Sequence, residues 1–230
     1  MSRSLPPRVD EATRRLFQRR LLAWYRRNGR TLPWRQTSDP YKILVSEIML
    51  QQTQVDRVIP KYHEFLQKYP TVSALAKAPR QKVKRDWYPL GYNIRPVHLQ
   101  MIARESVARY GGKLPDDAKA LQSFKGIGRY TAGAILSFAY KKDAPILDTN
   151  VRRVLGRLFL GAKKLATLKG SKLLWDLSES LIPKGNAYDW NQALMDFGAT
   201  WCTARAPRCL PCPMKRFCRS YPSLATTSPG

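Results

Sequence analysis

The chain has 230 residues, 43% of them hydrophobic, which excludes a disordered protein and allows a packed core in one large or two small domains. Its 41 Lys and Arg against 16 Asp and Glu give a formal charge of +25, which predicts a polyanionic partner, nucleic acid rather than a membrane surface. Because no run of about 18 apolar residues occurs, we expect no membrane-spanning segment.

The N-terminal segment is rich in arginine, as transit peptides are, but it carries acidic residues at Asp10 and Glu11 and has no small-residue cleavage site. Its apolar residues, including Phe17, Leu21 and Trp24, fall close to helical spacing. We therefore expect an amphipathic helix that packs against the rest of the fold. Without a signal peptide, the protein is expected in the cytoplasm or nucleoid of a prokaryote, or in the nucleus of a eukaryote, and not outside the cell.

Helical periodicity and helix boundaries recur along the rest of the chain, and no stretch alternates as a half-buried strand would. We therefore predict an all-α fold. Asp39 and Pro40 predict the N-cap and first turn of one helix, a second helix is expected from Thr53, and Thr71 is expected to cap a third. The expected helices after these cover residues 95–110, 116–124, 130–140, 150–159, 173–181 and 191–201.

Two glycines interrupt a helix-forming stretch, "SFKGIGRYTAGAIL", at residues 123–136. This pattern predicts a helix-hairpin-helix. One helix would end at Phe124, Gly126 and Gly128 would form the turn, and a new helix would begin at about Arg129. Glycines allow positive φ and a close phosphate, while the start of the second helix attracts an anion. The alternative is a glycine C-cap between two packed helices. The charge of +25 favours phosphate binding.

All four cysteines, Cys202, Cys209, Cys212 and Cys218, lie in one segment with the spacing C-x6-C-x2-C-x5-C. In a reducing compartment, clustered thiols are expected to be metal ligands in place of disulfides. The spacing leaves zinc and an iron-sulfur cluster both open, in a structural role. Basic neighbours that could meet a phosphate backbone are Arg205, Arg208, Lys215, Arg216 and Arg219.

Two carboxylates stand in contrasting sequence contexts. Glu47 lies within the apolar stretch "ILVSEIMLQQTQV", where burial would favour its protonated form and general acid catalysis, unless it reaches solvent or pairs with an arginine. Asp148 directly precedes an expected helix, where it could simply be an N-cap, and where N–H groups and the helix dipole would keep it charged. One protonated and one charged carboxyl suit cleavage of a glycosidic bond.

Seven motifs in order resemble the MutY family of adenine DNA glycosylases, within the helix-hairpin-helix superfamily that includes endonuclease III. The resemblance implies a six-helix barrel over residues 39–143, with the hairpin at about 121–135. It also implies a second helical domain formed by 1–38 and 144–230, a four-iron, four-sulfur (4Fe-4S) cluster bound by the cysteines at 202–218, and DNA across the cleft between the domains. The motifs are "LPWR", "SEIMLQQTQV", "LGY", "GIGRYTAGAIL", "ILDTNVRRVLGR", "NQALMDFGATWC" and the cysteine spacing.

The resemblance also assigns roles to individual residues. Glu47 matches the acid that protonates the leaving purine and then helps to activate water, Asp148 the carboxylate that stabilises the sugar cation, and Asn150 and Tyr130 groups that support this site. A base swung out of the duplex would enter a pocket formed by Leu32, Trp34, Arg35, Leu50 and Gln192. Duplex contacts are expected from Gln51, Gln52, Tyr92, Lys125, Gly126, Gly128, Arg129 and Thr131.

Several positions depart from relatives in the superfamily. Endonuclease III relatives have a lysine nucleophile where this chain has Tyr130, so we expect a monofunctional glycosylase that leaves an abasic site. Lys125 replaces a common proline in the hairpin, and "GYNIRP" replaces the usual "GYYAR" type of sequence. The chain stops soon after the cysteines, so we expect it to lack the C-terminal domain with which MutY proteins recognise oxidised guanine.

The expected function is therefore excision of adenine mispaired with guanine or 8-oxoguanine in double-stranded DNA, by a monomer that binds no membrane. The first alternative is a thymine or uracil glycosylase that acts on mismatches with guanine, since relatives of that specificity share the tyrosine, the aspartate and the cysteines. Gln192 and "LQQTQV" favour adenine, because an amide can pair with the adenine edge. The second alternative is a non-catalytic DNA-binding module, which the presence of both carboxylates argues against.

Overall fold

The structure is a computed structural model that describes residues 9–92, 94–167 and 172–224. Every regular element in these ranges is a helix, so the prediction of an all-α fold is confirmed. Within the same ranges, no helix combines the length and the apolar character that crossing a membrane requires.

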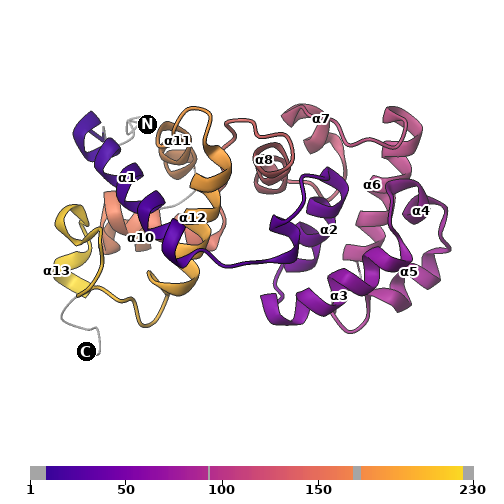
Figure 1. The fold of residues 1–230 in the computed structure, drawn as a ribbon, viewed down its shortest axis with the longest axis horizontal. Helices are drawn as coiled ribbons and strands as arrows, with labels where there is room; N and C mark the ends of the chain where they lie inside the picture. Colours follow the sequence, from indigo (N-terminus) through magenta and orange to yellow (C-terminus); the bar gives the residue numbers. More distant parts are fainter. Residues whose placement is uncertain (1–8, 93, 168–171, 225–230) are drawn as a thin grey trace. The chain divides into compact units, whose positions relative to one another are not determined.

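The chain divides into two compact units, which are drawn together in Figure 1. Residues 31–140 form one, which we call the central unit; the described parts of 1–30 and 141–230 form the other, which we call the terminal unit. The boundaries differ from the expected ones after residues 38 and 143. The first lies earlier because the short 3-10 helix η1 (Pro33–Arg35) packs against the helix that follows it in the central unit.

Helix α2 (Pro40–Leu50) is the core element of the central unit. Eight of its eleven residues are buried, because its sequence is almost wholly apolar and three other helices of the unit pack against it. A helix buried on nearly all sides can hold a polar side chain away from water. The other helices of this unit are α3 (Val55–Lys68), α4 (Val72–Lys77), α5 (Arg80–Trp87), α6 (Arg95–Tyr110), α7 (Ala118–Ser123) and α8 (Arg129–Phe138).

The predicted helix starts at Asp39 and Thr71 are confirmed. The Asp39 carboxylate accepts a 2.8 Å hydrogen bond from the N–H of Tyr41, and the Thr71 hydroxyl accepts one of 3.1 Å from Ala74. Helix α3 begins at Val55 and not at Thr53. Helix α5 was not predicted: only Val83 and Trp87 are buried in it, too few for a visible helical pattern in a strongly basic segment.

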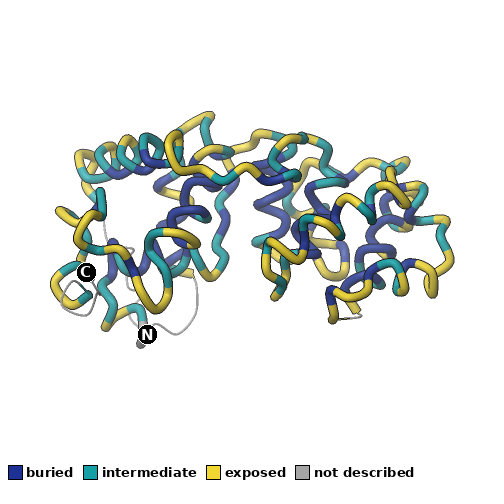
Figure 2. Tube along the Cα trace, turned by 60° about the horizontal axis from the view of Figure 1, so that its bottom comes forward, coloured by how far each residue is buried: buried dark blue, intermediate teal, exposed yellow. Residues whose placement is uncertain are grey.

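Helix α12 (Ala187–Thr200) is the core element of the terminal unit, and it packs against both α1 (Glu11–Asn28) and α9 (Thr149–Leu155). The Phe17 ring of α1 meets the edge of Trp190 at 5.0 Å, as the amphipathic prediction requires. In Figure 2, buried residues follow the helix sides that face neighbours in the same unit. The remaining elements are η2 (Gly156–Leu160), α10 (Ala162–Thr167), α11 (Lys172–Ser180), η3 (Lys215–Phe217) and α13 (Tyr221–Leu224).

Two elements of the terminal unit differ from expectation. Helix α12 starts at Ala187, four residues before the predicted 191. The helix expected over 150–159 changes at Gly156 into the π-helical turn η2. A Cβ on Gly156 would lie 2.4 Å from the side chain of Leu165, so this glycine allows α10, which was not predicted, to pack closely against the turn.

Candidate functional site

Glu47 lies on α2 with only 4% of its surface exposed. The neighbouring residues on the same helix, among them Leu44 and Ile48, are buried as well, so Glu47 lies in the interior of the central unit. Tyr130 is half-buried at the start of α8, a helix that packs against α2. The central unit therefore brings the helices of these two predicted site residues into contact.

The predicted base-pocket residues are divided between the two units. In the central unit, Leu32 and Trp34 are buried, and the Trp34 ring meets Tyr62 edge-on at 5.5 Å. Arg35 and Leu50 are half-buried there, which leaves part of each side chain accessible. In the terminal unit, Gln192 is buried on α12, where a hydrogen-bonding group left without a partner would be costly.

The turn after α2 carries Gln51 and Gln52, both exposed, and Gln52 has a left-handed backbone with φ of 57°. This turn is linked to the turn that precedes α6, because the buried guanidinium of Arg95 makes hydrogen bonds to both. The Arg95 Nη1 group donates to the carbonyls of Met49 at 2.9 Å and of Gln51, and Nη2 donates to Leu90 at 2.8 Å. The sequence analysis missed Arg95, which links two turns with predicted duplex contacts.

Burial lowers the pKa of Arg95, because water cannot solvate its charge. Backbone carbonyl dipoles replace that solvation, and the guanidinium also lies 5.1 Å from the ring of Tyr92. Tyr92, a predicted duplex contact, is 56% exposed and has a left-handed φ of 47°. The exposed Tyr92 ring is thus in a cation–π contact with the buried guanidinium of Arg95.

The predicted hairpin is present between α7 and α8. Gly126 has a φ of +102°, which favours glycine, and a Cβ there would lie 3.1 Å from His98. Gly128 is different: its φ is −88°, and no atom lies within 4 Å of where its Cβ would be. Gly128 gives α8 no side-chain cap, so the backbone at this helix start is open to an anion.

The other predicted duplex contacts of the hairpin differ in exposure. Lys125 and Arg129 are exposed, as contacts to phosphate require. Thr131, in the first turn of α8, is buried, so its side chain is not part of the exposed surface of the hairpin. The apolar packing of α8 against α2 and α7 accounts for this burial.

Asp148 is the N-cap of α9 in the terminal unit. Its carboxylate accepts a 2.6 Å hydrogen bond from the N–H of Val151 and one of 3.1 Å from the amide of Asn150. Burial raises the pKa of Asp148, while these donors and the charge of Arg153 oppose the rise. The expected donors are therefore present, and they oppose a rise in pKa for which burial is the largest cause.

Arg153 fixes the position of Asn150. Its guanidinium donates to the Asn150 side-chain oxygen at 2.7 Å, to the carbonyl of Gly198 at 2.6 Å and to that of Cys202 at 2.8 Å. A Cβ on Gly198 would lie 2.7 Å from the Cβ of Asn150, so a glycine is needed where α12 meets α9. The sequence analysis missed both Arg153 and Gly198.

The four cysteines line one cavity of the terminal unit as free thiols. Burial raises the pKa of Cys212 to about 12, which makes an isolated thiolate there unfavourable. The N–H of Met214 points to Cys212 Sγ at 3.4 Å, and Arg157 Nη1 approaches Cys202 Sγ at 3.5 Å. Four sulfur donors with nearby N–H groups fit a thiolate-bound metal centre.

The four thiols share one cavity, although no group of three or more His, Cys, Asp or Glu side chains among the described residues is positioned to hold a metal ion. The loop is held by backbone contacts from elsewhere in the unit: Arg157 donates to the carbonyl of Thr203 at 2.6 Å and Arg20 of α1 to that of Pro213 at 2.5 Å. The cysteines therefore stand on a braced loop.

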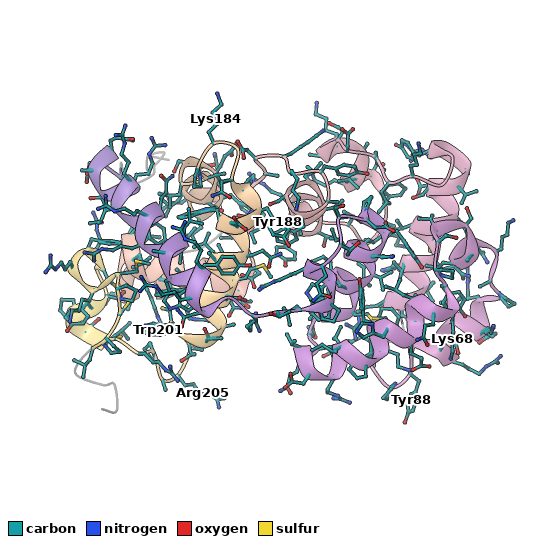
Figure 3. The ribbon with its side chains drawn as sticks, in the orientation of Figure 1. Lys68, Tyr88, Lys184, Tyr188, Trp201 and Arg205 are labelled. Carbon is teal, nitrogen blue, oxygen red and sulfur yellow. The ribbon has the colours of Figure 1, made fainter. Side chains whose placement is uncertain are left out.

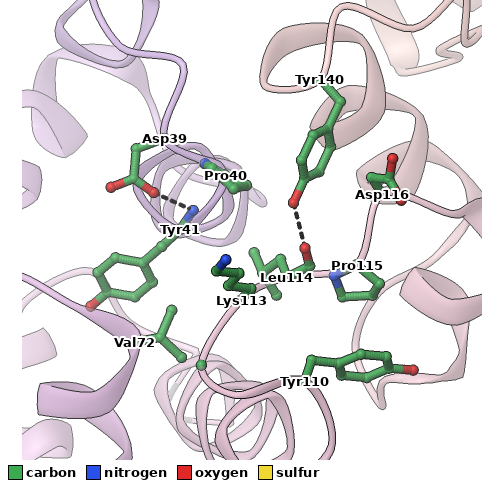
Figure 4. Close-up of a pocket in the computed structure, with 11 residues that line it drawn as sticks. Asp39, Pro40, Tyr41, Val72, Tyr110, Lys113, Leu114, Pro115, Asp116 and Tyr140 are labelled. Carbon is green, nitrogen blue, oxygen red and sulfur yellow. Dashed lines mark hydrogen bonds between the residues drawn. The ribbon is translucent and has the colours of Figure 1, made fainter.

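A cavity of about 570 Å³ lies in the central unit, where α2 begins (Figure 4). Asp39, Tyr41, Tyr110 and Tyr140 line it, and the Tyr140 hydroxyl donates to the carbonyl of Leu114. Glu47 is seven residues further along α2, or about 10 Å at 1.5 Å per residue. The cavity was not predicted, and it belongs to the opposite end of α2 from Gln51.

Comparisons with known proteins agree with this arrangement. Residues 45–179 match the family model described as HhH-GPD superfamily base excision DNA repair protein. The chain is 42% identical over 222 residues to the mouse adenine DNA glycosylase, across 92% of this chain and 43% of the relative. It is 36% identical to the thymine/uracil-DNA glycosylase of Methanothermobacter thermautotrophicus, across 95% of this chain and all of the relative.

Solved structures show the same likeness. The structure of a thermostable thymine-DNA glycosylase superposes with a TM-score of 0.85 at 35% identity, covering 91% of this chain and 97% of that one. A non-covalent endonuclease III–DNA complex superposes with a TM-score of 0.77 at 22% identity, which shows a shared fold. The chain spans less than half the length of the mammalian relatives that it matches.

Proposed function

Because the chain belongs to the HhH-GPD superfamily of base excision DNA repair proteins, we propose that it is a DNA glycosylase that removes adenine mispaired with guanine or 8-oxoguanine. The observation that carries the chemistry is the pair of contrasting carboxyl groups. Glu47 is buried within a nearly apolar helix, and Asp148 is held by two hydrogen-bond donors at the start of α9. These are the settings expected of a proton donor and of an anionic stabiliser.

In the proposed reaction, Glu47 donates its proton to a ring nitrogen of the base as the bond from that base to the sugar breaks. The bonding electron pair leaves with the base, and the sugar becomes an oxocarbenium-like cation. Water then adds its oxygen to the sugar carbon and returns a proton to Glu47. The atoms balance as hydrolysis, with an abasic site and a free base as products.

Asp148 stabilises the developing cation. Burial raises its pKa, so its negative charge is poorly solvated before the reaction. A positive sugar therefore gains more from this carboxylate in the transition state than a neutral sugar does in the ground state. Asn150, fixed by Arg153, holds the carboxylate in place through its amide. Tyr130 stands where a lyase would need a lysine, which supports base release without strand cleavage.

Two features support adenine as the base. Identity to curated adenine DNA glycosylases reaches 42%, against 36% for the thymine/uracil relatives. The buried amide of Gln192 can both donate and accept, as the adenine edge requires. A thymine or uracil glycosylase is the second candidate, because this chain covers the full length of the archaeal relative and superposes closely on the thermostable thymine-DNA glycosylase.

We also propose that the four cysteines bind a 4Fe-4S cluster. The proposal is supported by four thiols around one cavity and by the cysteine spacing that the family resemblance matches to such a cluster. Bound there, the cluster would supply a rigid anchor for the basic loop. A brown protein that contains iron is the expected result, and a colourless protein loaded with zinc would overturn the assignment.

The base can be tested with single-turnover assays on four duplexes, with adenine opposite 8-oxoguanine, adenine opposite guanine, thymine opposite guanine and uracil opposite guanine. We expect release of adenine from the first two and an abasic product that stays uncleaved until it is heated in alkali. Release of thymine or uracil without adenine would replace the proposal with the second candidate. Spontaneous strand cleavage at rates equal to base release would overturn the monofunctional assignment.

A further inference from the structure

Tyr88 directly follows α5, at the start of the segment between α5 and α6, and we call residues 88–92 the aromatic turn. It is 77% exposed, more than any other large apolar or aromatic side chain given as exposed in the described chain. Figure 3 shows Tyr88 projecting outward from the central unit. The family resemblance assigns a duplex contact to Tyr92 of the same turn and none to Tyr88.

The exposure of Tyr88 is not the result of a loosely packed turn. Trp87, directly before it, is fully buried, meets Phe65 edge-on at 5.6 Å and donates from its indole N–H to the carbonyl of Gly91 at 3.3 Å. Leu90, two residues after Tyr88, is buried as well. The residues on either side of Tyr88 therefore anchor the turn, while the Tyr88 ring extends into solvent.

The aromatic turn is also tied to the exposed glutamines after α2. Arg95 donates to the carbonyls of Leu90 at 2.8 Å and Gly91 at 3.3 Å, and on its other side to Met49 and Gln51. One buried guanidinium thus holds both turns at fixed positions in the central unit. A ligand that contacts Gln51 can therefore also contact the aromatic turn, without a rearrangement of either turn.

The charge around the turn favours an anionic partner. Helix α5, which leads directly into Tyr88, has four basic residues and one acidic residue. That acid, Asp86, is engaged by Lys68 at 2.7 Å and by the hydroxyl of Tyr69 at 2.7 Å. A flat aromatic ring next to uncompensated cations is the combination that binds the bases and phosphates of a nucleic acid strand.

We propose that Tyr88 stacks on a nucleobase of the bound DNA and forms a second aromatic contact beside Tyr92. The inference rests on the proposed DNA binding but not on which base is excised. Because the ring is already exposed and its turn is fixed, stacking costs little reorganisation of the protein. An unpaired or distorted nucleotide offers the ring face that Tyr88 needs, so the contact should favour duplexes with a lesion over intact ones.

The test uses the full chain and a duplex with a tetrahydrofuran abasic analogue, whose affinity is measured by fluorescence anisotropy. We expect Tyr88→Ala to lower the affinity about 5- to 100-fold, the loss of one base–aromatic stack. The matched control, Tyr88→Phe, keeps the ring and should bind within about twofold of the wild type. Both variants should melt at the wild-type temperature, because the side chain has few contacts to lose.

Equal affinities of Tyr88→Ala and Tyr88→Phe would overturn the inference. Tyr88-dependent binding to vesicles with anionic lipids, together with unchanged DNA affinity, would replace it with a membrane contact. The analogue has no base to release, so this result is independent of the excision assays. A chain that releases no adenine but still loses affinity in Tyr88→Ala would disprove the proposed substrate and leave the stacking contact standing.

Discussion

The two candidate catalytic carboxyl groups are supported by different kinds of structure. Glu47 sits in the interior of α2, where apolar neighbours surround it. Asp148 sits at the end of α9, where hydrogen bonds from Val151 and Asn150 hold it and Arg153 fixes Asn150 in turn. Glu47 is thus buried within a packed helix, whereas Asp148 belongs to a polar network at a helix end. Substitutions should therefore affect the two sites in different ways.

The largest expected effect comes from Glu47→Gln. Glutamine matches the shape of glutamate but cannot donate the catalytic proton, so base release should fall about 100- to 10,000-fold. DNA affinity should stay near the wild-type value, because the site is unchanged in size. Single-turnover rates and anisotropy, measured on the same mispaired duplex, separate the two quantities. A variant that retains a tenth of the wild-type rate would remove Glu47 from its proposed role.

Asp148→Asn should lower base release about 100- to 1,000-fold, because the amide carries no charge to stabilise the sugar cation. The amide oxygen can still accept from Val151, so the helix cap should remain. Burial raises the pKa of Asp148 in the folded protein, which means that its ionisation opposes folding at neutral pH. The variant should therefore melt on the order of a few degrees higher than the wild type at pH 7.

The pH dependence gives that prediction its sign. In the wild type, ionised Asp148 lowers the free energy of unfolding at pH values above its raised pKa in the folded state. This destabilisation disappears below the ordinary pKa of 3.8, where Asp148 is protonated in both the folded and the unfolded protein. The melting advantage of Asp148→Asn should thus shrink as the pH falls toward that value. An advantage that grows on acidification would show that the charge of Asp148 stabilises the fold.

Gly198→Ala tests the polar network from a distance. The new Cβ would lie 2.7 Å from the Cβ of Asn150, so α9 must shift, at a cost of about 1–3 kcal/mol. Base release should fall together with the melting temperature, whereas Glu47→Gln should leave melting unchanged. Thermal unfolding and single-turnover assays of the two variants provide the comparison. Unchanged values for Gly198→Ala would mean that α12 does not position Asn150.

The smallest effect on stability is expected for Gly128→Ala, in the unit that carries Glu47. Nothing lies within 4 Å of its Cβ position, and its φ of −88° suits alanine, so stability should change by less than about 0.5 kcal/mol. DNA affinity should nevertheless fall several-fold, because the Cβ would meet an approaching phosphate. If affinity is unchanged, the hairpin glycine serves only to connect α7 and α8.

The regular elements with strong local signals were predictable from sequence. The helix expected over 95–110 matches α6, since a proline lies in its first turn and Gly111, with φ of 59°, ends it. The caps at Asp39 and Thr71 also match. Helix α5 lacks a repeated apolar face and was missed. Local sequence patterns were thus enough to predict most of the helices.

The supports of the candidate site were not predictable in the same way. Arg95 and Arg153 are two among 41 basic residues, and nothing in the sequence separates a buried guanidinium from a solvated one. Gly198 lies within a helix, where its contact with Asn150 depends on how α12 packs on α9. Likewise, sequence revealed the donors around Asp148 but not the burial that outweighs them.

The connectivity of the units has a consequence for synthesis on the ribosome. The central unit is continuous in sequence, whereas the terminal unit joins α1 to α12, whose first residue is number 187. The apolar face of α1, formed by Phe17, Leu21 and Trp24, therefore emerges long before α12. While the central unit folds, the nascent chain carries this apolar face exposed to solvent. A chaperone that binds this apolar face would prevent aggregation of the nascent protein until α12 has been synthesised.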